Sequence, residues 1–230
     1  MLGIIGAMDE EVAQIKERME VEAVVKKAGM EFYKGLLNGK AAVVVKSGIG
    51  KVNAAVCTQI LVDCFDVTAV VNTGIAGSLR NEINIGDIVL SKDALHHDMD
   101  STGFGYAPGQ IPRMEVLSFE ADERLVELAK ECCSRVNPDI QTFVGRVVSG
   151  DQFISDKAKK EWIKNQFEGF CTEMEGAAIA QACYLNQVPF LIIRAISDKA
   201  DDSANMDYAA FEAKAITHSV NLLLEIALRY

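Results

Sequence analysis

The sequence predicts an α/β fold with three layers, in which helices cover both faces of a central mixed β-sheet. Short apolar runs rich in Val and Ile alternate along the chain with longer segments of helical periodicity, the order typical of this class. No segment rich in Pro, Gly or Ser divides the chain, and 230 residues fit one large domain as well as two small ones. We therefore expect a single domain over residues 1–230.

The predicted strands are near-continuous apolar runs, which suit strands that are covered on both faces. The six runs are Leu2–Met8, Ala41–Ser47, Val67–Thr73, Asp87–Ser91, Phe143–Ser149 and Pro189–Ser197. Within Met30–Ala42, Asn38-Gly39 is a hairpin-turn signal between two strands. A hairpin adds antiparallel pairing, so the sheet is predicted to be mixed.

Segments of helical periodicity separate these strands. The six predicted helices are Glu10–Met19, Val52–Phe65, Ala121–Val136, Asp156–Asn165, Glu175–Leu185 and Tyr208–Leu228. The longest stretch without a pattern is His97–Pro112, which contains three glycines, two prolines, Phe104 and Tyr106. Long loops in compact domains are usually functional or disordered, and the aromatics favour a functional loop. We call His97–Pro112 the lid loop.

Charge and composition exclude several classes of partner. Lys and Arg total 23 and Asp and Glu total 33, which gives a net charge of −10. Such an acidic chain is a poor candidate for binding nucleic acid or an anionic membrane. The N-terminal MLGIIGAMDEEV has no basic region, and no apolar stretch is long enough to cross a bilayer. The six cysteines form no CxxC pair, so we expect buried, reduced thiols and a cytoplasmic location.

Two glycine-rich turns point to a ligand at the carboxyl ends of strands. Ser47–Lys51 contains Gly-x-Gly after a strand, but Asn53 stands where a dinucleotide fingerprint needs a third glycine, and the phosphate-loop pattern is also absent. Gly74–Gly77 is predicted to be a second turn of this kind. Ligands of open α/β sheets bind beyond the carboxyl ends of the strands. The prediction is a small-molecule site there, without a nucleotide cofactor.

The cluster His96-His97-Asp98-x-Asp100 has ligand types that suit a metal ion. Adjacent histidines in a strand point to opposite faces, so both rarely reach one ion. The remaining histidine, His218, lies far along the chain in a predicted helix. We therefore expect neither a metal site nor a cofactor.

Carboxylates gather at three of the predicted strand ends. Asp9-Glu10-Glu11 follows the first strand, Glu173-Met-Glu175 follows another, and Ser197-Asp198 ends a third that also contains Arg194. Asp9 and Glu10 are expected only to stabilise the start of a helix. Buried carboxylates are usually paired or chemically active, so Asp198 and Arg194 could be a simple ion pair. As a set, these residues suit acid–base chemistry on a small polar molecule.

Six motifs follow one another along the chain: GIIGAMDEE (Gly3–Glu11), SGIGKVNAA (Ser47–Ala55), NTGIAG (Asn72–Gly77), SGDQFI (Ser149–Ile154), EMEGAAIA (Glu173–Ala180) and RAISDKAD (Arg194–Asp201). Together they resemble the bacterial 5′-methylthioadenosine/S-adenosylhomocysteine nucleosidases. The resemblance runs from the first residues to the last helix. It implies the nucleoside phosphorylase/hydrolase fold, which purine nucleoside phosphorylases share.

The resemblance implies cleavage of an N-glycosidic bond by water in methionine salvage, without a cofactor. Methylthioadenosine, S-adenosylhomocysteine and 5′-deoxyadenosine would release adenine. Asp198 matches the general acid that protonates the leaving purine, supported by Ser197. Glu11 matches the carboxylate that orients and deprotonates the attacking water, with Arg194 nearby. The sugar becomes positively charged as its bond to the base breaks, which carboxylates stabilise.

The resemblance also implies a set of substrate-binding residues and a second subunit. Glu175 and Met174 match residues that hold the ribose, Phe153 matches the aromatic that stacks on adenine, and the backbone of Ile154 would read the base. The remaining pocket residues that it implies are Met8, Ile49, Gly77, Phe104, Tyr106 and Tyr208. Pro112 matches a position that crosses a dimer interface, so a homodimer is expected.

Three alternative functions stay open on the sequence. A phosphorylase would need cations for phosphate, and GAMDEE and NTGIAG contain no arginine, although Arg80 could reach inward. An aminodeoxyfutalosine nucleosidase would share the reaction but differ in the 5′ group. A nucleoside-binding module without activity would not need Glu11, Glu175 and Asp198 together. Ile75 departs from the serine that many members carry in NTGSAG, which affects fine preference rather than reaction class.

Overall fold

The computed structural model describes residues 1–200 and 204–230, with side chains described for 1–200 and 211–230. The strands are β1 (Leu2–Gly6), β2 (Met19–Lys27), β3 (Met30–Leu37), β4 (Lys40–Lys46), β5 (Ala69–Ser78), β6 (Ile88–His96), β7 (Phe119–Glu120), β8 (Thr142–Ser149), β9 (Cys171–Glu173) and β10 (Phe190–Asp198). The helices are α1 (Asp9–Lys16), α2 (Lys51–Phe65), α3 (Glu123–Val136), α4 (Lys157–Phe167), α5 (Gly176–Asn186) and α6 (Ala204–Arg229), with a short 3₁₀ turn at Thr102–Phe104.

The strands form one mixed sheet in the order β10-β6-β8-β9-β5-β1-β4-β3-β2, with β7 beside β6. β10 also pairs with β5, so β5, β10, β6, β8 and β9 close into a ring. Pairs such as β1–β4 and β1–β5 are parallel, whereas β3–β4 and β10–β6 are antiparallel. The prediction of a mixed sheet is confirmed.

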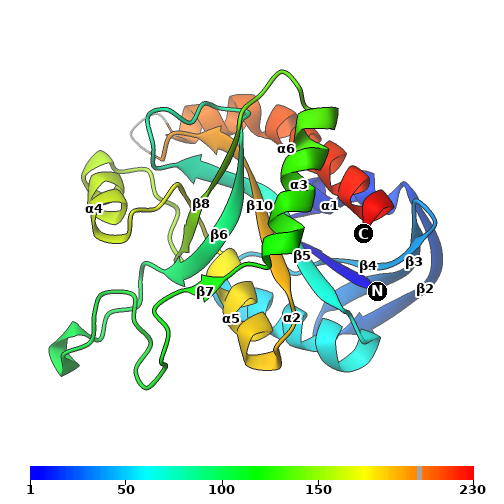
Figure 1. Ribbon diagram of the computed structural model, residues 1–230, viewed down its shortest axis with the longest axis horizontal. Helices are drawn as coiled ribbons and strands as arrows, with labels where there is room; N and C mark the ends of the chain where they lie inside the picture. The colour runs from blue at the N-terminus through cyan, green and yellow to red at the C-terminus, as the bar shows by residue number, and fades with distance from the viewer. Residues whose placement is uncertain (201–203) are drawn as a thin grey trace.

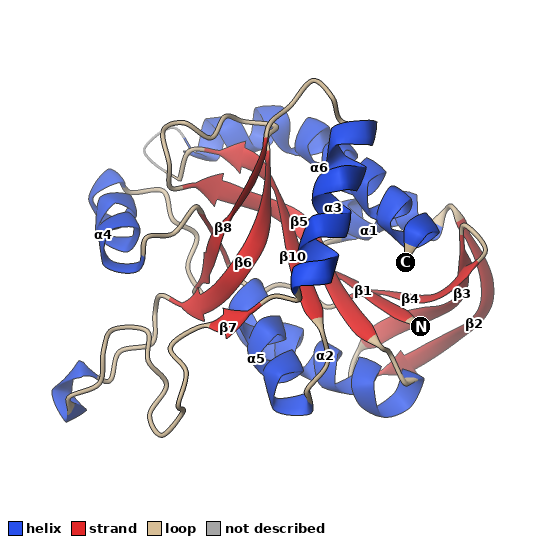
Figure 2. Ribbon diagram, in the orientation of Figure 1, coloured by secondary structure: helices blue, strands red, loops and turns tan. Residues whose placement is uncertain are grey.

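Helices cover both faces of the sheet (Figures 1 and 2). On one face, α1, α3 and α6 bury apolar side chains such as Ile15, Ala129 and Leu223 in a single cluster with β1 and β10. On the other face, α2 and α5 pack Leu61 and Ile179 against the same sheet. Burial of these two faces is the main stabilising contribution. The predicted three-layer α/β fold is confirmed.

The hairpin between β3 and β4 also follows the prediction. Asn38 and Gly39 have φ angles of 51° and 76°, the left-handed conformation that both central residues of a type I′ turn adopt. Leu37 pairs with Lys40 across this turn.

The first predicted helix was too long, and the strand that follows it was missed. α1 ends at Lys16, and Met19 begins β2 instead of closing the helix. Residues 20–27 of β2 are exposed on both faces of the strand. Polar and apolar residues alternate only over Glu20–Ala23 and stop doing so at Val24-Val25, so the run is too short to stand out as a half-buried strand. β7 and β9, of two and three residues, are absent from the six predicted runs, although Glu173 was expected to follow a strand. Gly74–Gly77, predicted as a turn, lies inside β5, which continues to Ser78.

All six cysteines are free, but one of them is not buried as predicted. Cys64 is exposed near the end of α2, where the Nζ of Lys27 lies 3.0 Å from its sulfur. The apolar neighbours of Cys64 in the sequence face the core while Cys64 faces outward, a consequence of helical periodicity. In the part of the chain that is described, no helix is long and apolar enough to span a bilayer.

Candidate active site

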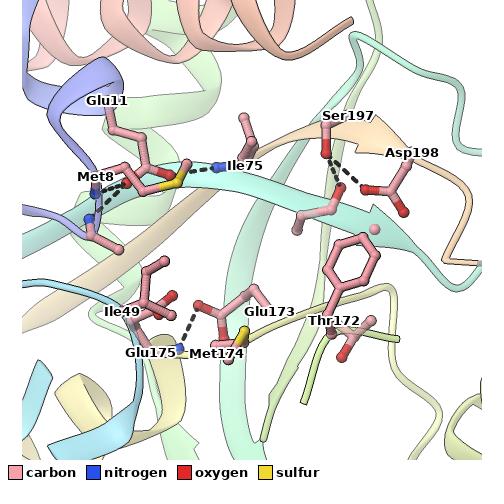
Figure 3. A pocket seen from close by; sticks show the side chains of 14 residues that line it. Met8, Glu11, Ile49, Ile75, Thr172, Glu173, Met174, Glu175, Ser197 and Asp198 are labelled. Atoms are coloured by element: carbon pink, nitrogen blue, oxygen red, sulfur yellow. Dashed lines mark hydrogen bonds between the residues drawn. The ribbon is translucent and has the colours of Figure 1, made fainter. Parts of the chain in front are cut away.

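A cavity of about 370 Å³ opens where several strands end (Figure 3). Its walls come from the residues after β1, the last residues of β5, β9 and β10, and the loops that follow β4 and β8. This is the carboxyl edge of the sheet, where ligands of such folds bind. The lining residues are Ala7, Met8, Glu11, Ile49, Ile75, Ala76, Gly77, Phe153, Thr172, Glu173, Met174, Glu175, Ser197 and Asp198.

Glu11 is held by backbone donors in the first turn of α1. Its carboxylate accepts hydrogen bonds from the N–H groups of Ala7 (2.6 Å), Met8 (3.0 Å) and Ile75 (3.2 Å). The first two bonds cap the helix, and the third ties it to β5. Burial raises the pKa of Glu11, although Arg194 and these three N–H groups oppose the rise. A fixed carboxylate with a raised pKa is suited to accept a proton.

Gly74 allows Glu11 to approach Arg194. A Cβ at residue 74 would overlap the Glu11 carboxylate and would lie 3.1 Å from Nη1 of Arg194. Gly74 and Arg194 face each other in the β5–β10 register. The absence of a side chain at Gly74 therefore creates the space in which the carboxylate and the guanidinium meet.

Arg194 is paired with Glu173 rather than with Asp198. Its guanidinium donates to the Glu173 carboxylate and to Oδ1 of Asn72, and the Arg194 side chain is only 2% exposed. Ser149 and the N–H of Gly176 also donate to Glu173. Burial alone would raise the pKa of Glu173, but Arg194 and these donors hold it below its ordinary value. Glu173 is thus an ionised carboxylate that fixes Arg194 behind the cavity wall.

Glu175 lies two residues further on, at the start of α5. Its Oε1 accepts a hydrogen bond of 2.8 Å from the N–H of Gly50. Burial and the neighbouring Glu173 raise the pKa of Glu175 to about 7, against the opposing effects of Arg194 and Gly50. Met174 and Ile49 line the cavity beside it (Figure 3). This wall presents an acceptor between apolar surfaces, which suits a sugar with hydroxyl groups.

Asp198 ends β10 on another side of the cavity (Figure 3). Ser197 Oγ donates to its Oδ2 at 2.8 Å, and the N–H of Ala200 donates to Oδ1 at 2.7 Å. A Cβ at Gly77 would lie only 2.7 Å from Oδ1, so the glycine lets the buried carboxylate rest against β5. Asp198 also lines a neighbouring space of about 30 Å³ together with Phe153 and Ile154.

The structure brings most of the expected residues together but leaves others apart. Phe104, Tyr106 and Pro112 do not line the cavity, and Phe104 is 87% exposed on a loop that extends away from the sheet (Figure 1). The side chain of Tyr208 lies outside the described residues. Arg80 does not reach inward, because its guanidinium donates to the carbonyls of Glu168 and Gly169.

The histidine cluster is used for other contacts. His96 Nε2 lies 3.0 Å from the Gln181 side chain, and the Asp98 carboxylate accepts from Nζ of Lys51. Within residues 1–200 and 211–230, no three His, Cys, Asp or Glu side chains are grouped so that they could hold a metal ion. The sequence reasoning did not assign roles to Asn72, Ser149 and Glu173. Only the spacing Glu173-x-Glu175 hinted at a second carboxylate on this wall.

Known proteins resemble this chain over almost its whole length. A family model described as the phosphorylase superfamily matches residues 1–228. The 5′-methylthioadenosine/S-adenosylhomocysteine nucleosidase of Geobacillus thermodenitrificans is 45% identical over 97% of this chain and 94% of its own length.

Solved structures give the same family. The nucleosidase of this name from Neisseria meningitidis, in complex with methylthio-immucillin-A, has a TM-score of 0.95 at 39% identity, covering 100% of this chain and 99% of that one. Futalosine hydrolase of Helicobacter pylori has a TM-score of 0.94 at 35% identity, covering 100% and 97%. With near-complete coverage by both the family model and the relatives, the chain belongs to the 5′-methylthioadenosine/S-adenosylhomocysteine nucleosidase family of the phosphorylase superfamily.

Proposed function

We propose that this protein hydrolyses the N-glycosidic bond of 5′-methylthioadenosine and S-adenosylhomocysteine, releasing adenine. The observation that carries this proposal is one cavity with Glu11 and Glu175 on one part of its wall and Asp198 on another. The transition state needs negative charge near the sugar and a proton donor near the base. Glu11 and Glu175 would supply the first and Asp198 the second, and two relatives named as nucleosidases of this kind are 45% and 42% identical to this chain.

In the proposed mechanism, each carboxylate has one task. Asp198, oriented by Ser197 and the Ala200 N–H, gives a proton to the five-membered ring of the leaving purine. Glu11 takes a proton from water, which attacks the sugar carbon as its bond to the base breaks. Glu175 accepts hydrogen bonds from the ribose hydroxyls. A positioned acid or base contributes roughly 10²–10⁴ in rate.

The charges around the cavity favour water over phosphate as the nucleophile. No Arg or Lys is among the described residues that line the cavity, and Arg194 behind the wall is already neutralised by Glu173. Arg80, the other cation that the sequence left open, is held by backbone carbonyls elsewhere. A phosphate dianion would meet Glu11 and Glu175 without a compensating charge.

Aminodeoxyfutalosine is the second candidate substrate, because the similarity to a futalosine hydrolase is nearly as high as to the nucleosidases. Both substrate classes carry adenine on ribose and differ at the 5′ position. Met8, Ile49 and Ile75 contribute apolar surface to the cavity, which favours a thioalkyl group.

A panel assay of adenine release tests this proposal. The substrates are methylthioadenosine, S-adenosylhomocysteine, 5′-deoxyadenosine, aminodeoxyfutalosine and inosine, each with and without phosphate. We expect the first two to have the highest kcat/KM and phosphate to have no effect. A strict requirement for phosphate would overturn hydrolysis, and a preference for inosine would overturn the assignment of adenine.

We further propose a homodimer whose subunits each place the lid loop over the partner's cavity. Phe104 extends away from its own cavity, and apolar side chains stand exposed on α2 and α5, such as Val52 (75%) and Leu185 (64%). A dimer would cover them. Sedimentation should give twice the chain mass, and Val52→Lys with Leu185→Glu should give a monomer. Methionine salvage in the cytoplasm is the setting that we propose for this enzyme.

A further inference from the structure

Three residues, none of which lines the cavity, form a hydrogen-bonded cluster that the proposed mechanism does not use. Nζ of Lys51 donates to both carboxylate oxygens of Asp98, at 2.6 and 2.7 Å. Oδ2 of Asp98 also accepts from the N–H of Asp151 at 3.0 Å. Oδ1 of Asp151 in turn accepts from the N–H of Lys51 at 2.9 Å. We call Lys51, Asp98 and Asp151 the latch.

The latch joins three segments that are far apart in the sequence. Lys51 begins α2, directly after the loop that carries Ile49 and Gly50. Asp151 lies in the loop after β8, two residues before Phe153. Asp98 stands at the root of the lid loop, two residues after the end of β6. Two of the three joined segments line the cavity, on the side of the sugar and on the side of the base.

Lys51 and Asp151 of the latch are next to, or two residues from, residues that line the cavity or orient its carboxylates. Gly50, adjacent to Lys51, donates its N–H to Glu175, so a shift of Lys51 moves the donor that orients this carboxylate. Gly50 has a φ of 98°, and a Cβ there would lie 3.2 Å from Oδ1 of Asp151. The two loops therefore touch where they are bonded, and a change in one is transmitted to the other.

The ring of His97 supports the same loop from behind. His97 is 2% exposed, and neither ring nitrogen has a hydrogen-bond partner among the described residues. A Cβ at Gly150 would overlap this ring, so the imidazole packs directly against the backbone before Asp151. The loop is thus confined by packing on one side and by the Asp98 carboxylate on the other.

We propose that Asp98 is a positioning residue, which holds the Ile49–Gly50 loop and the Asp151–Phe153 loop at a fixed separation through Lys51 and Asp151. It acts through the groups that contact substrate and not by contact of its own. Loss of the latch should let the base-stacking Phe153 and the Gly50 N–H move independently. Substrate and adenine should then bind more weakly, while proton transfer by Asp198 and Glu11 is affected less. This inference rests on the proposed function.

The test compares Asp98→Asn with a matched control, Asp93→Asn. Asp93 forms the analogous half-buried ion pair with Arg146, at 2.5 Å, and the two carboxylate side chains are similarly covered, 9% exposed for Asp93 and 15% for Asp98. Neither Asp93 nor Arg146 lines the cavity. Both variants should lose comparable stability. Only Asp98→Asn should raise KM and the Kd of adenine, each by about tenfold, with kcat changed by about twofold at most.

Further variants keep the proposal falsifiable if Asp98→Asn folds poorly. Lys51→Met should reproduce its rise in KM, Lys51→Arg should retain most of the affinity, and Lys51→Met with Asp98→Asn should cost less than the sum of the two. Adenine binding by calorimetry needs no turnover, so it tests the latch even if the enzyme cleaves none of the proposed substrates. Equal adenine Kd in wild type and Asp98→Asn, or equal changes in Asp98→Asn and Asp93→Asn, would overturn the positioning role.

Discussion

The carboxylates on the floor of the cavity and the side chains of the lid loop differ in how many contacts they make within the chain. On the floor, Glu11, Glu173 and Asp198 are buried, and each carboxylate accepts hydrogen bonds from within the chain. In the lid loop, Phe104 stands 87% exposed at the end of a short 3₁₀ turn. The carboxylates are therefore positioned by contacts within one chain, whereas the lid loop leaves the cavity of its own chain uncovered, a gap that the partner's loop would fill in the proposed dimer.

This difference separates two kinds of residue that a single function needs. In the proposed function, the floor residues would act through fixed charges at buried positions, where electrostatic effects are strong. The lid residues would act by covering apolar parts of the substrate, which contributes less free energy per residue. Changes on the floor should therefore alter rate or stability strongly, and changes in the lid should alter affinity modestly.

The largest effect is expected for Asp198→Asn. The amide keeps the shape, and with its oxygen towards the Ala200 N–H its NH2 group can donate to Ser197 Oγ, but it has no acidic proton for the purine. We expect kcat to fall by roughly 10²–10⁴ while adenine still binds. Rates of adenine release under saturating substrate measure this, with calorimetry as the control for binding. A variant with the kcat of the wild type would remove Asp198 from the mechanism.

Glu173→Gln should have the next largest effect, and on stability rather than only on rate. The substitution leaves the guanidinium of Arg194 buried without its counter-charge, which costs about 3–5 kcal/mol of unfolding free energy. Denaturant unfolding measures the loss.

The double variant Glu173→Gln with Arg194→Met removes both charges and should be less destabilised than the single one. If the single variant is as stable as the wild type, Glu173 does not hold Arg194 in the way its hydrogen bonds indicate.

The strands that form the floor could be predicted from the sequence, but the side-chain contacts between them could not. Apolar runs and the Asn38-Gly39 turn predicted the sheet, because burial and turn geometry leave a local signature. The pairing of Arg194 with Glu173 could not be predicted in this way, because it depends on the register between strands. Ser149 faces Glu173 in β8–β9 and Gly74 faces Arg194 in β5–β10, and such pairings between distant segments have no local pattern.

The lid loop was predictable in composition but not in position. Phe104, Tyr106 and Pro112 were expected at the pocket because of the resemblance, yet none of them lines the cavity of this chain. A single sequence does not say which copy of a chain a loop covers. β2 was also missed, because residues 20–27 are exposed and bury no face against the core.

His97, at the boundary between floor and lid, should make stability depend on pH. Burial lowers the pKa of His97 to about 4, whereas an unfolded histidine has a pKa of about 6.5. As the pH falls from about 6.5 towards 4, the unfolded chain takes up a proton that the folded chain does not. The free energy of unfolding should then decrease, by up to about 1.4 kcal/mol per pH unit from this group.

His97→Phe fills a similar space without titrating, so its slope of unfolding free energy against pH should be smaller over that range. His96, whose pKa burial also lowers, should account for part of the slope that remains. Urea unfolding at a series of pH values measures both slopes. Parallel curves for the variant and the wild type would show that His97 is not kept neutral by burial.

The smallest effect is expected for Phe104→Ala, and it decides the comparison between floor and lid. An exposed ring contributes little to the fold, so unfolding should be unchanged, whereas KM for methylthioadenosine should rise about tenfold through lost apolar cover. Dimers mixed from Phe104→Ala and Asp198→Asn chains then locate the lid. If the loop covers the partner's cavity, each hybrid has one site with both Asp198 and Phe104 intact, and the low KM returns. If the loop covers its own cavity, no site is intact and KM stays high.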